Sequence, residues 1–179
     1  MPASVVSVHR HEAHSFSKPA VDEIKLIEGI GVSGDAHAGT TVKHRSRVAK
    51  DPSAPNLRQV HLIHQELFEL VATAGYTVAP GELGENITTQ GLELLNLPVG
   101  TRLRIGVAVL TVTGLRNPCL QINNYQPGLL KQVLRQGDSG SVEKLAGVMS
   151  IVSRGGTVRP GDKIEVILPP PPHFPLTGV

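Results

Sequence analysis

The only cysteine of the chain, Cys119, offers the widest chemistry of any residue in the sequence. It ends the run Arg116-Asn117-Pro118-Cys119, directly after a predicted strand. An ionised thiolate is both a nucleophile and a soft metal ligand, and the nearby Arg116 favours the ionised form. A free cysteine is also often an inert, buried part of a hydrophobic core. Both interpretations stay open, although a position at the end of a strand favours the reactive one.

A glycine-rich segment with a basic continuation is the second candidate. Asp35 and His37 lie in the sequence GDAHAG, just after the turn glycines Gly29 and Gly31. Four basic residues follow within a dozen positions: Lys43, His44, Arg45 and Arg47. Backbone amides and guanidinium groups in such a loop suit a phosphate or another anion with several oxygen atoms. The alternative is a solvated basic loop in which Asp35 forms an Asx-turn.

The sequence PGELGENITTQG contains a third candidate, Asn86, beside Glu85. An asparagine amide offers both a donor and an acceptor to a planar heterocycle. The alternative is a structural asparagine that bonds the backbone of its own turn, and this motif alone favours that alternative.

Histidines are concentrated between residues 37 and 64, at His37, His44, His61 and His64. A zinc site needs three or four ligands that converge on one point. The sequence contains neither an HExxH motif nor paired cysteines, and His61 and His64 flank a predicted strand-to-helix junction, so we expect them to face different ways. We therefore expect no zinc site.

Short strands joined by glycine and proline turns must position these residues. We predict strands over 3–8, 21–26, 57–63, 102–116, 147–156 and 158–168, the fourth as a hairpin in which Leu103, Ile105, Val107 and Val109 alternate with other residues. We predict helices over 64–76 and within 120–146. This order favours a mainly β fold, a barrel or sandwich with a few inserted helices, over a Rossmann fold. No GxGxxG or P-loop motif is present.

Length and composition set the limits of the assignment. A chain of 179 residues is one domain, which we place over 1–168, followed by an extended and poorly packed Pro-rich tail over 169–179. No apolar run reaches the about 18 residues of a membrane span. Aromatic residues make up 3% of the chain, which argues against a stacking platform for nucleic acids. One cysteine excludes an internal disulfide and fits a reducing cytoplasm.

The ordered set of motifs resembles the MOSC-domain family, named for the C-terminal domain of the molybdenum cofactor sulfurase, in its stand-alone bacterial form. The resemblance rests on GVSGDAHAG at 31–39, LRQVHLI at 57–63, PGELGENITTQGLEL at 80–94, VGTRLRIGVAVLTVTGLRNPC at 99–119 and GVMSIVSRGGTVRPGDKIEV at 147–166. The resemblance implies a β-barrel related to the barrel of pyruvate kinase. It also matches Cys119 to the family's cysteine, which carries sulfur or ligates the molybdenum of a pterin cofactor.

On this resemblance we expect a molybdenum-cofactor-dependent oxidoreductase that reduces small N-hydroxylated molecules. Asp35, His37, Asn86 and Arg116 would line the cofactor cavity. We expect Arg45 and Arg58 to hold the pterin phosphate, an inference from charge chemistry. The chain has no cysteine set for an iron–sulfur cluster, so electrons must come from a separate donor protein; haem is not expected either.

Three other functions stay open. In the first, the domain is a non-catalytic carrier of the cofactor or of sulfur, held as a Cys119 persulfide. In the second, it is an anion-binding barrel with an inert Cys119. In the third, Cys119 pairs with a histidine in a hydrolase, although nothing in the sequence fixes such a pair.

Overall fold

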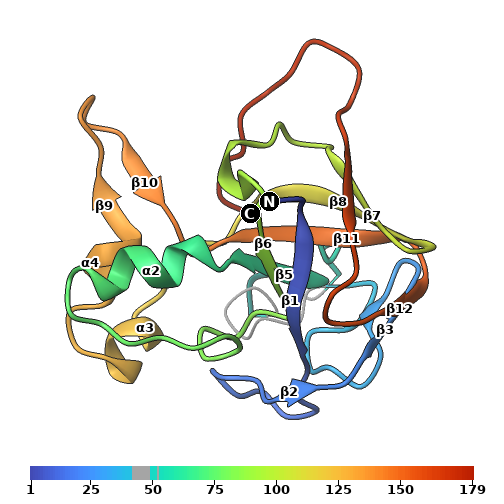
Figure 1. Ribbon diagram of the computed structural model, residues 1–179, viewed down its shortest axis with the longest axis horizontal. Coiled ribbons are helices and arrows are strands. Elements are labelled where there is room, and N and C mark those ends of the chain that lie inside the picture. The colour runs from blue at the N-terminus through green and yellow to red at the C-terminus, as the bar shows by residue number, and fades with distance from the viewer. Residues whose placement is uncertain (42–48, 52) are drawn as a thin grey trace.

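The computed structural model describes residues 1–41, 49–51 and 53–179 (Figure 1). Its strands are β1 Ser4–His9, β2 Ala20–Val21, β3 Ile24–Ile27, β4 Gly31–Val32, β5 Val60–His64, β6 Ile87–Gln90, β7 Arg102–Ile105, β8 Ala108–Leu115, β9 Leu134–Gln136, β10 Val142–Lys144, β11 Val148–Arg154, β12 Gly156–Val158 and β13 Ile164–Ile167. Its helices are α2 Glu66–Ala72, α3 Gln121–Tyr125, α4 Leu130–Val133 and the 3₁₀ helix η1 Leu94–Asn96.

One large sheet organises the fold. Its eight strands follow the order β13-β7-β8-β11-β5-β6-β1-β2, beside a sheet of β12-β3-β4 and a hairpin of β9 and β10. The β5–β6 pair is parallel, and the other pairs of the large sheet in the described ranges are antiparallel. A single bridge from Ser4 to Lys163 links β1 to the start of β13, but no sheet of the described residues closes into a ring of paired strands. The mainly β class with few helices is confirmed, whereas the closed barrel stays a prediction.

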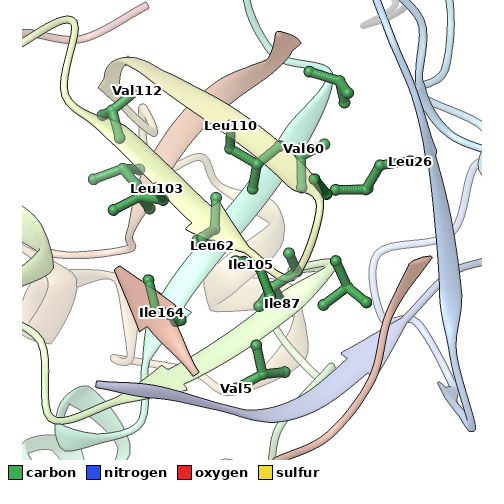
Figure 2. Packing of buried hydrophobic residues seen from close by; sticks show 14 of the residues in the cluster. Val5, Leu26, Val60, Leu62, Ile87, Leu103, Ile105, Leu110, Val112 and Ile164 are labelled. Carbon is green, nitrogen blue, oxygen red and sulfur yellow. The ribbon is translucent and has the colours of Figure 1, made fainter. Parts of the chain in front are cut away.

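The main core lies on one face of this sheet and follows the two-residue period of its strands. Inward residues alternate along β8, where Leu110 and Val112 are buried, and β7 contributes Leu103 and Ile105. Figure 2 shows these side chains converging with others from β1, β5, β6 and β13. The burial of this apolar surface is the main favourable contribution to folding.

The predicted alternation through Val107 and Val109 is wrong. Gly106 takes a φ of 61° in the turn between β7 and β8, and Val107 in that turn is 62% exposed. The tight turn shifts the alternation by one residue, so Ala108 replaces Val109 on the inward face. Because side chains alternate along a strand, a shift of one residue in the pattern moves every side chain of the strand to the opposite face of the sheet.

A second core lies on the opposite face of β5. Ile63 packs there with the buried face of α2, which consists of Leu67, Phe68 and Val71. The segments around α3 and α4 complete this cluster, and Figure 1 shows the three helices gathered at one end of the sheet. The predicted helix over 64–76 is confirmed in shorter form, and Gly75 takes a positive φ of 89° just beyond it.

The last residues are packed, so the expectation of a poorly packed tail is wrong for them. Leu176 is 8% exposed and belongs to the main core. Leu115 donates its N–H to Thr177 O at 2.7 Å, and Val179 donates its N–H to Leu115 O at 3.1 Å. Residues 177–179 therefore pair with the end of β8 through an isolated parallel bridge between Leu115 and Gly178. The domain boundary at 168 stays a prediction.

No helix in the described ranges is both long and apolar enough to cross a membrane.

The docked C-terminal segment makes a testable contribution to stability. Truncation of a buried leucine leaves a cavity, so we expect Leu176→Ala to lower the free energy of unfolding by about 2–3 kcal/mol. Phe174→Ala is the matched control, because this side chain is 60% exposed and its truncation costs about 0.5 kcal/mol or less. Urea unfolding monitored by circular dichroism measures both variants. Equal effects of the two substitutions would show that the segment is not docked in solution.

Candidate functional site

Cys119 lies on a short segment that is fixed at both ends. β8 ends at Leu115, and the next residue, Arg116, donates its N–H to Gly147 O at 3.0 Å. On the other side, Ile122 donates its N–H to Cys119 O at 3.0 Å as α3 begins. The cysteine is half-buried, with its Sγ 3.6 Å from Gln121 Oε1. The thiol is therefore accessible yet held in place.

Asn117 anchors the same segment to two distant parts of the chain. Its Oδ1 accepts a hydrogen bond from Lys144 Nζ at 2.6 Å. Its Nδ2 donates to Val179 O at 3.0 Å. The packed C-terminal residues thus support the segment two residues before Cys119.

A pocket of about 750 Å³ opens beside Cys119. Its wall combines the N-terminal loop, the ends of the central strands and the start of α3; the lining residues are His14, Ser15, Phe16, Lys18, His37, Asn56, Arg58, His61, Leu83, Gly84, Asn86, Arg116, Asn117, Pro118, Cys119, Leu120, Gln121, Asn124 and Met149. The period of β5 explains the position of His61: Val60 and Leu62 face the main core, and His61 faces the opposite side.

The pocket brings together five of the residues predicted from the sequence, namely Cys119, Arg116, Asn86, His37 and Arg58. Asp35 does not line the pocket; it lies behind His37 and contacts Lys18. Arg45 lies outside the described residues. His61 lines the pocket and His64 does not, as expected for residues on different faces of β5.

Arg116 places a buried positive charge next to the cysteine. Its Nη1 donates to Leu83 O at 2.6 Å, and the guanidinium carbon lies 5.9 Å from the centre of the Phe16 ring. Burial lowers the pKa of Arg116, while the neighbouring Cys119 and Glu85 raise it. A desolvated cation at this position attracts an anion in the pocket.

Asn86 has a structural role that its pocket position does not reveal. Its Oδ1 accepts the N–H of His61 at 3.1 Å, and its Nδ2 donates to His9 O at 3.2 Å. The amide therefore joins β5 to β1, which differs from the expected bond to its own turn. One N–H of the amide group stays available for a ligand, so a binding role is still a prediction.

Lys18, which sequence reasoning missed, forms a buried cluster with Asp35 and His37. Its Nζ lies 2.9 Å from Asp35 Oδ2 and 3.3 Å from His37 Nδ1. Burial raises the pKa of Asp35, but the nearby His37 side chain and the Lys18 ammonium outweigh this effect and hold the pKa below its usual value. Burial lowers the pKa of Lys18, and Asp35 opposes this effect. No sequence signal marks Lys18, because it lies in a polar loop without periodicity.

Two further buried groups stand around the pocket. His61 is held through Nε2 by Ala146 O at 2.8 Å, and burial, followed by the charge of Arg116, lowers the pKa of His61 well below its ordinary value. Glu85 accepts hydrogen bonds at Oε1 from Gly81 N at 2.6 Å and Thr88 Oγ1 at 2.9 Å. Burial raises the pKa of Glu85. In the part of the chain that the structure describes, no three His, Cys, Asp or Glu side chains group as metal ligands.

The chain is similar to known proteins in both sequence and structure. Residues 37–165 match the sequence model of the MOSC domain. A Bacillus subtilis (strain 168) protein, named "Putative metal-sulfur cluster biosynthesis proteins YuaD", is 29% identical over 180 residues, which cover 93% of this chain and 91% of that protein.

Solved structures extend this likeness. YuaD from Bacillus subtilis superposes with a TM-score of 0.75 at 27% identity, covering 93% of this chain and 96% of that chain. YiiM from Geobacillus stearothermophilus superposes with a TM-score of 0.63 at 17% identity, covering 93% and 75% of the two chains. YiiM from Escherichia coli superposes with a TM-score of 0.62 at 24% identity, covering 97% of this chain and 73% of that chain. The two YiiM proteins show the shared fold.

The buried Lys18–Asp35 pair leads to a prediction about stability. Asp35→Asn leaves the Lys18 ammonium buried without its counter-charge, so we expect the free energy of unfolding to fall by about 3–5 kcal/mol at neutral pH. Because the folded-state pKa of Asp35 is lowered, its contribution is full above the unfolded-state value of about 4 and is lost as the pH falls through the folded-state value.

Urea unfolding of both proteins at neutral pH and at about pH 3 tests this. The difference between wild type and Asp35→Asn should shrink on acidification. Asp138→Asn, at an exposed position in the turn between β9 and β10, is the control and should match the wild type. A difference that grows on acidification would contradict the assignment.

Proposed function

Since the chain belongs to the MOSC domain family, we propose that it binds the molybdenum cofactor in this pocket and reduces small N-hydroxylated molecules. Cys119 is then the ligand to molybdenum. The single observation that carries the proposal is the accessible Cys119 thiol on the wall of a pocket of about 750 Å³, beside the buried cation Arg116.

The residues present fit such a group. Ligand pockets usually have volumes of about 300–1,000 Å³, and this one is within that range. Among the described lining residues, Lys18, Arg58 and Arg116 are cationic and none is a carboxylate. This charge suits a cofactor that carries a phosphate and a thiolate-bound metal. When bound, the cofactor would supply the two electrons that remove the oxygen atom.

The protein's own residues have separate roles in this proposal. Cys119 holds the metal, and the buried guanidinium of Arg116 places a positive charge beside it. Arg58, with Arg45 outside the described residues, binds the phosphate. Asn86 offers its remaining N–H to the pterin ring, and the electrons reach the site from a separate donor protein.

A second candidate is a carrier that holds sulfur as a Cys119 persulfide and does not turn over substrate. The name of the YuaD relative, which refers to metal–sulfur cluster biosynthesis, favours it. The accessible thiol supports it equally, because a persulfide must be delivered to a partner.

The metal content of the protein separates the two candidates. We expect near-stoichiometric molybdenum in wild-type protein made in a host that synthesises the cofactor, and a loss of about tenfold or more in Cys119→Ser, because a metal site depends on its ligand. Elemental analysis measures the metal, and mass spectrometry of the intact protein detects added sulfur.

A double variant provides the matched control. Cys119→Ser with Ser139→Cys keeps one cysteine per chain but moves it to the exposed turn between β9 and β10. It should bind as little molybdenum as Cys119→Ser alone. Equal molybdenum in all three proteins contradicts the proposed ligand. A wild-type protein without molybdenum but with one extra sulfur atom on Cys119 supports the carrier instead.

A further inference from the structure

We propose that Lys18 holds the His37 imidazole in a single neutral tautomer, so that His37 donates its Nε2–H to an oxygen atom of the ligand in the pocket. The ligand class rests on the proposed function: the oxygen is the hydroxyl oxygen of an N-hydroxylated compound. Lys18 is then a positioning residue, and His37 contacts the substrate.

The contacts of Lys18 decide which ring nitrogen carries the proton. Its Nζ lies between two acceptors, at 2.9 Å from Asp35 Oδ2 and 3.3 Å from His37 Nδ1. An ammonium group only donates hydrogen bonds, so Nδ1 must accept. A neutral imidazole that accepts at Nδ1 carries its proton on Nε2.

Asp35 keeps Lys18 in the ammonium form. The carboxylate accepts hydrogen bonds from His11 N at 3.1 Å and His37 N at 3.2 Å in addition to Lys18 Nζ. Both side chains of the pair are buried, at 3% exposure for Lys18 and 0% for Asp35. Because a buried carboxylate with three donors is ionised, the lysine beside it is stabilised as a cation.

Asp35 does not itself take the proton of the ring. Its Oδ2 is 3.6 Å from His37 Nδ1, which is too long for a hydrogen bond. The lysine therefore stands in the place that a carboxylate holds in the usual carboxylate–imidazole pair. This inverts the tautomer, because a carboxylate would select the Nδ1–H form.

The other edge of the ring is the one that a ligand can reach. Nδ1 faces the buried pair, so Nε2 lies on the far edge of a side chain that is 32% exposed and lines the pocket. In the described ranges of the chain, Nε2 has no hydrogen-bond partner. The His14 ring packs edge-on against the His37 ring, with 5.7 Å between the ring centres, and restricts the plane of the His37 ring.

The charges around His37 keep the ring neutral. The contact with Asp35 raises the pKa of His37, but burial and the charges of Lys18 and His14 outweigh it, and the pKa lies below its ordinary value. A neutral ring donates one hydrogen bond to a ligand oxygen without adding a charge to a pocket that already holds three cations.

Nuclear magnetic resonance of ¹⁵N-histidine-labelled protein tests the tautomer without any cofactor. At about pH 7.5, well above the usual histidine pKa, we expect the neutral Nε2–H form of His37 in the wild type. Lys18→Arg should keep it, because a guanidinium also only donates. Lys18→Met should give a mixture with the Nδ1–H form. An Nδ1–H ring or an imidazolium in the wild type would overturn the proposal.

Substitutions of His37 test the contact with the ligand. The side-chain amide of Gln reaches about as far as Nε2 and that of Asn about as far as Nδ1. With hydroxylamine as the probe and molybdenum-loaded protein, we expect His37→Gln to keep kcat/KM within about threefold and His37→Asn to lose about five- to tenfold. Equal losses in both variants would overturn the role of the Nε2–H.

The two proposals fail in different ways. A wild-type protein that binds no molybdenum contradicts the proposed function, while the tautomer measured without cofactor still decides the position of the proton. The wrong tautomer in a protein that does bind molybdenum contradicts only the role of Lys18.

Discussion

The burial of β5 on both faces is the constraint on which the rest of the structure depends. Val60 and Leu62 face the main core, and Ile63 faces the second core under α2. Because a strand alternates its side chains, His61 must then point into the side of the sheet where the second core lies. The pocket is lined by His61 on that side of the sheet and by the Cys119 segment. A shift of one residue in β5 would exchange the contents of core and pocket.

Positive side chains line the pocket, and the negative side chains lie buried behind them. The cations Lys18, Arg58 and Arg116 reach its surface, whereas the carboxylates Asp35 and Glu85 are buried and do not line it. The deep carboxylates stabilise the cations, and they do so without offering a negative surface to a ligand. A pocket built in this way favours anions even though the chain as a whole carries a net charge of only +2.

Much of this arrangement follows from the sequence, and the exceptions have physical reasons. The strand before Cys119 and the turn glycines Gly29 and Gly31, with φ of 71° and 126°, are local features and were predictable. The role of Lys18 was not predictable, because it depends on a contact with Asp35, which lies seventeen positions away in the sequence. The hairpin of β9 and β10 was also missed, since strands of three residues carry almost no periodic signal. The closed barrel and the roles of the pocket residues remain predictions.

The contact between Asn117 and Val179 links the pocket to the order in which the chain is made. The two residues are 62 positions apart in the sequence. A protein chain emerges from the ribosome with its N-terminal part first. When residues 116–119 have been synthesised, the C-terminal residues that support them through Val179 have not yet been made. The sheet can therefore assemble before the Asn117–Val179 contact forms, so the wall of the pocket beside Cys119 is among the last parts of the described fold to be completed.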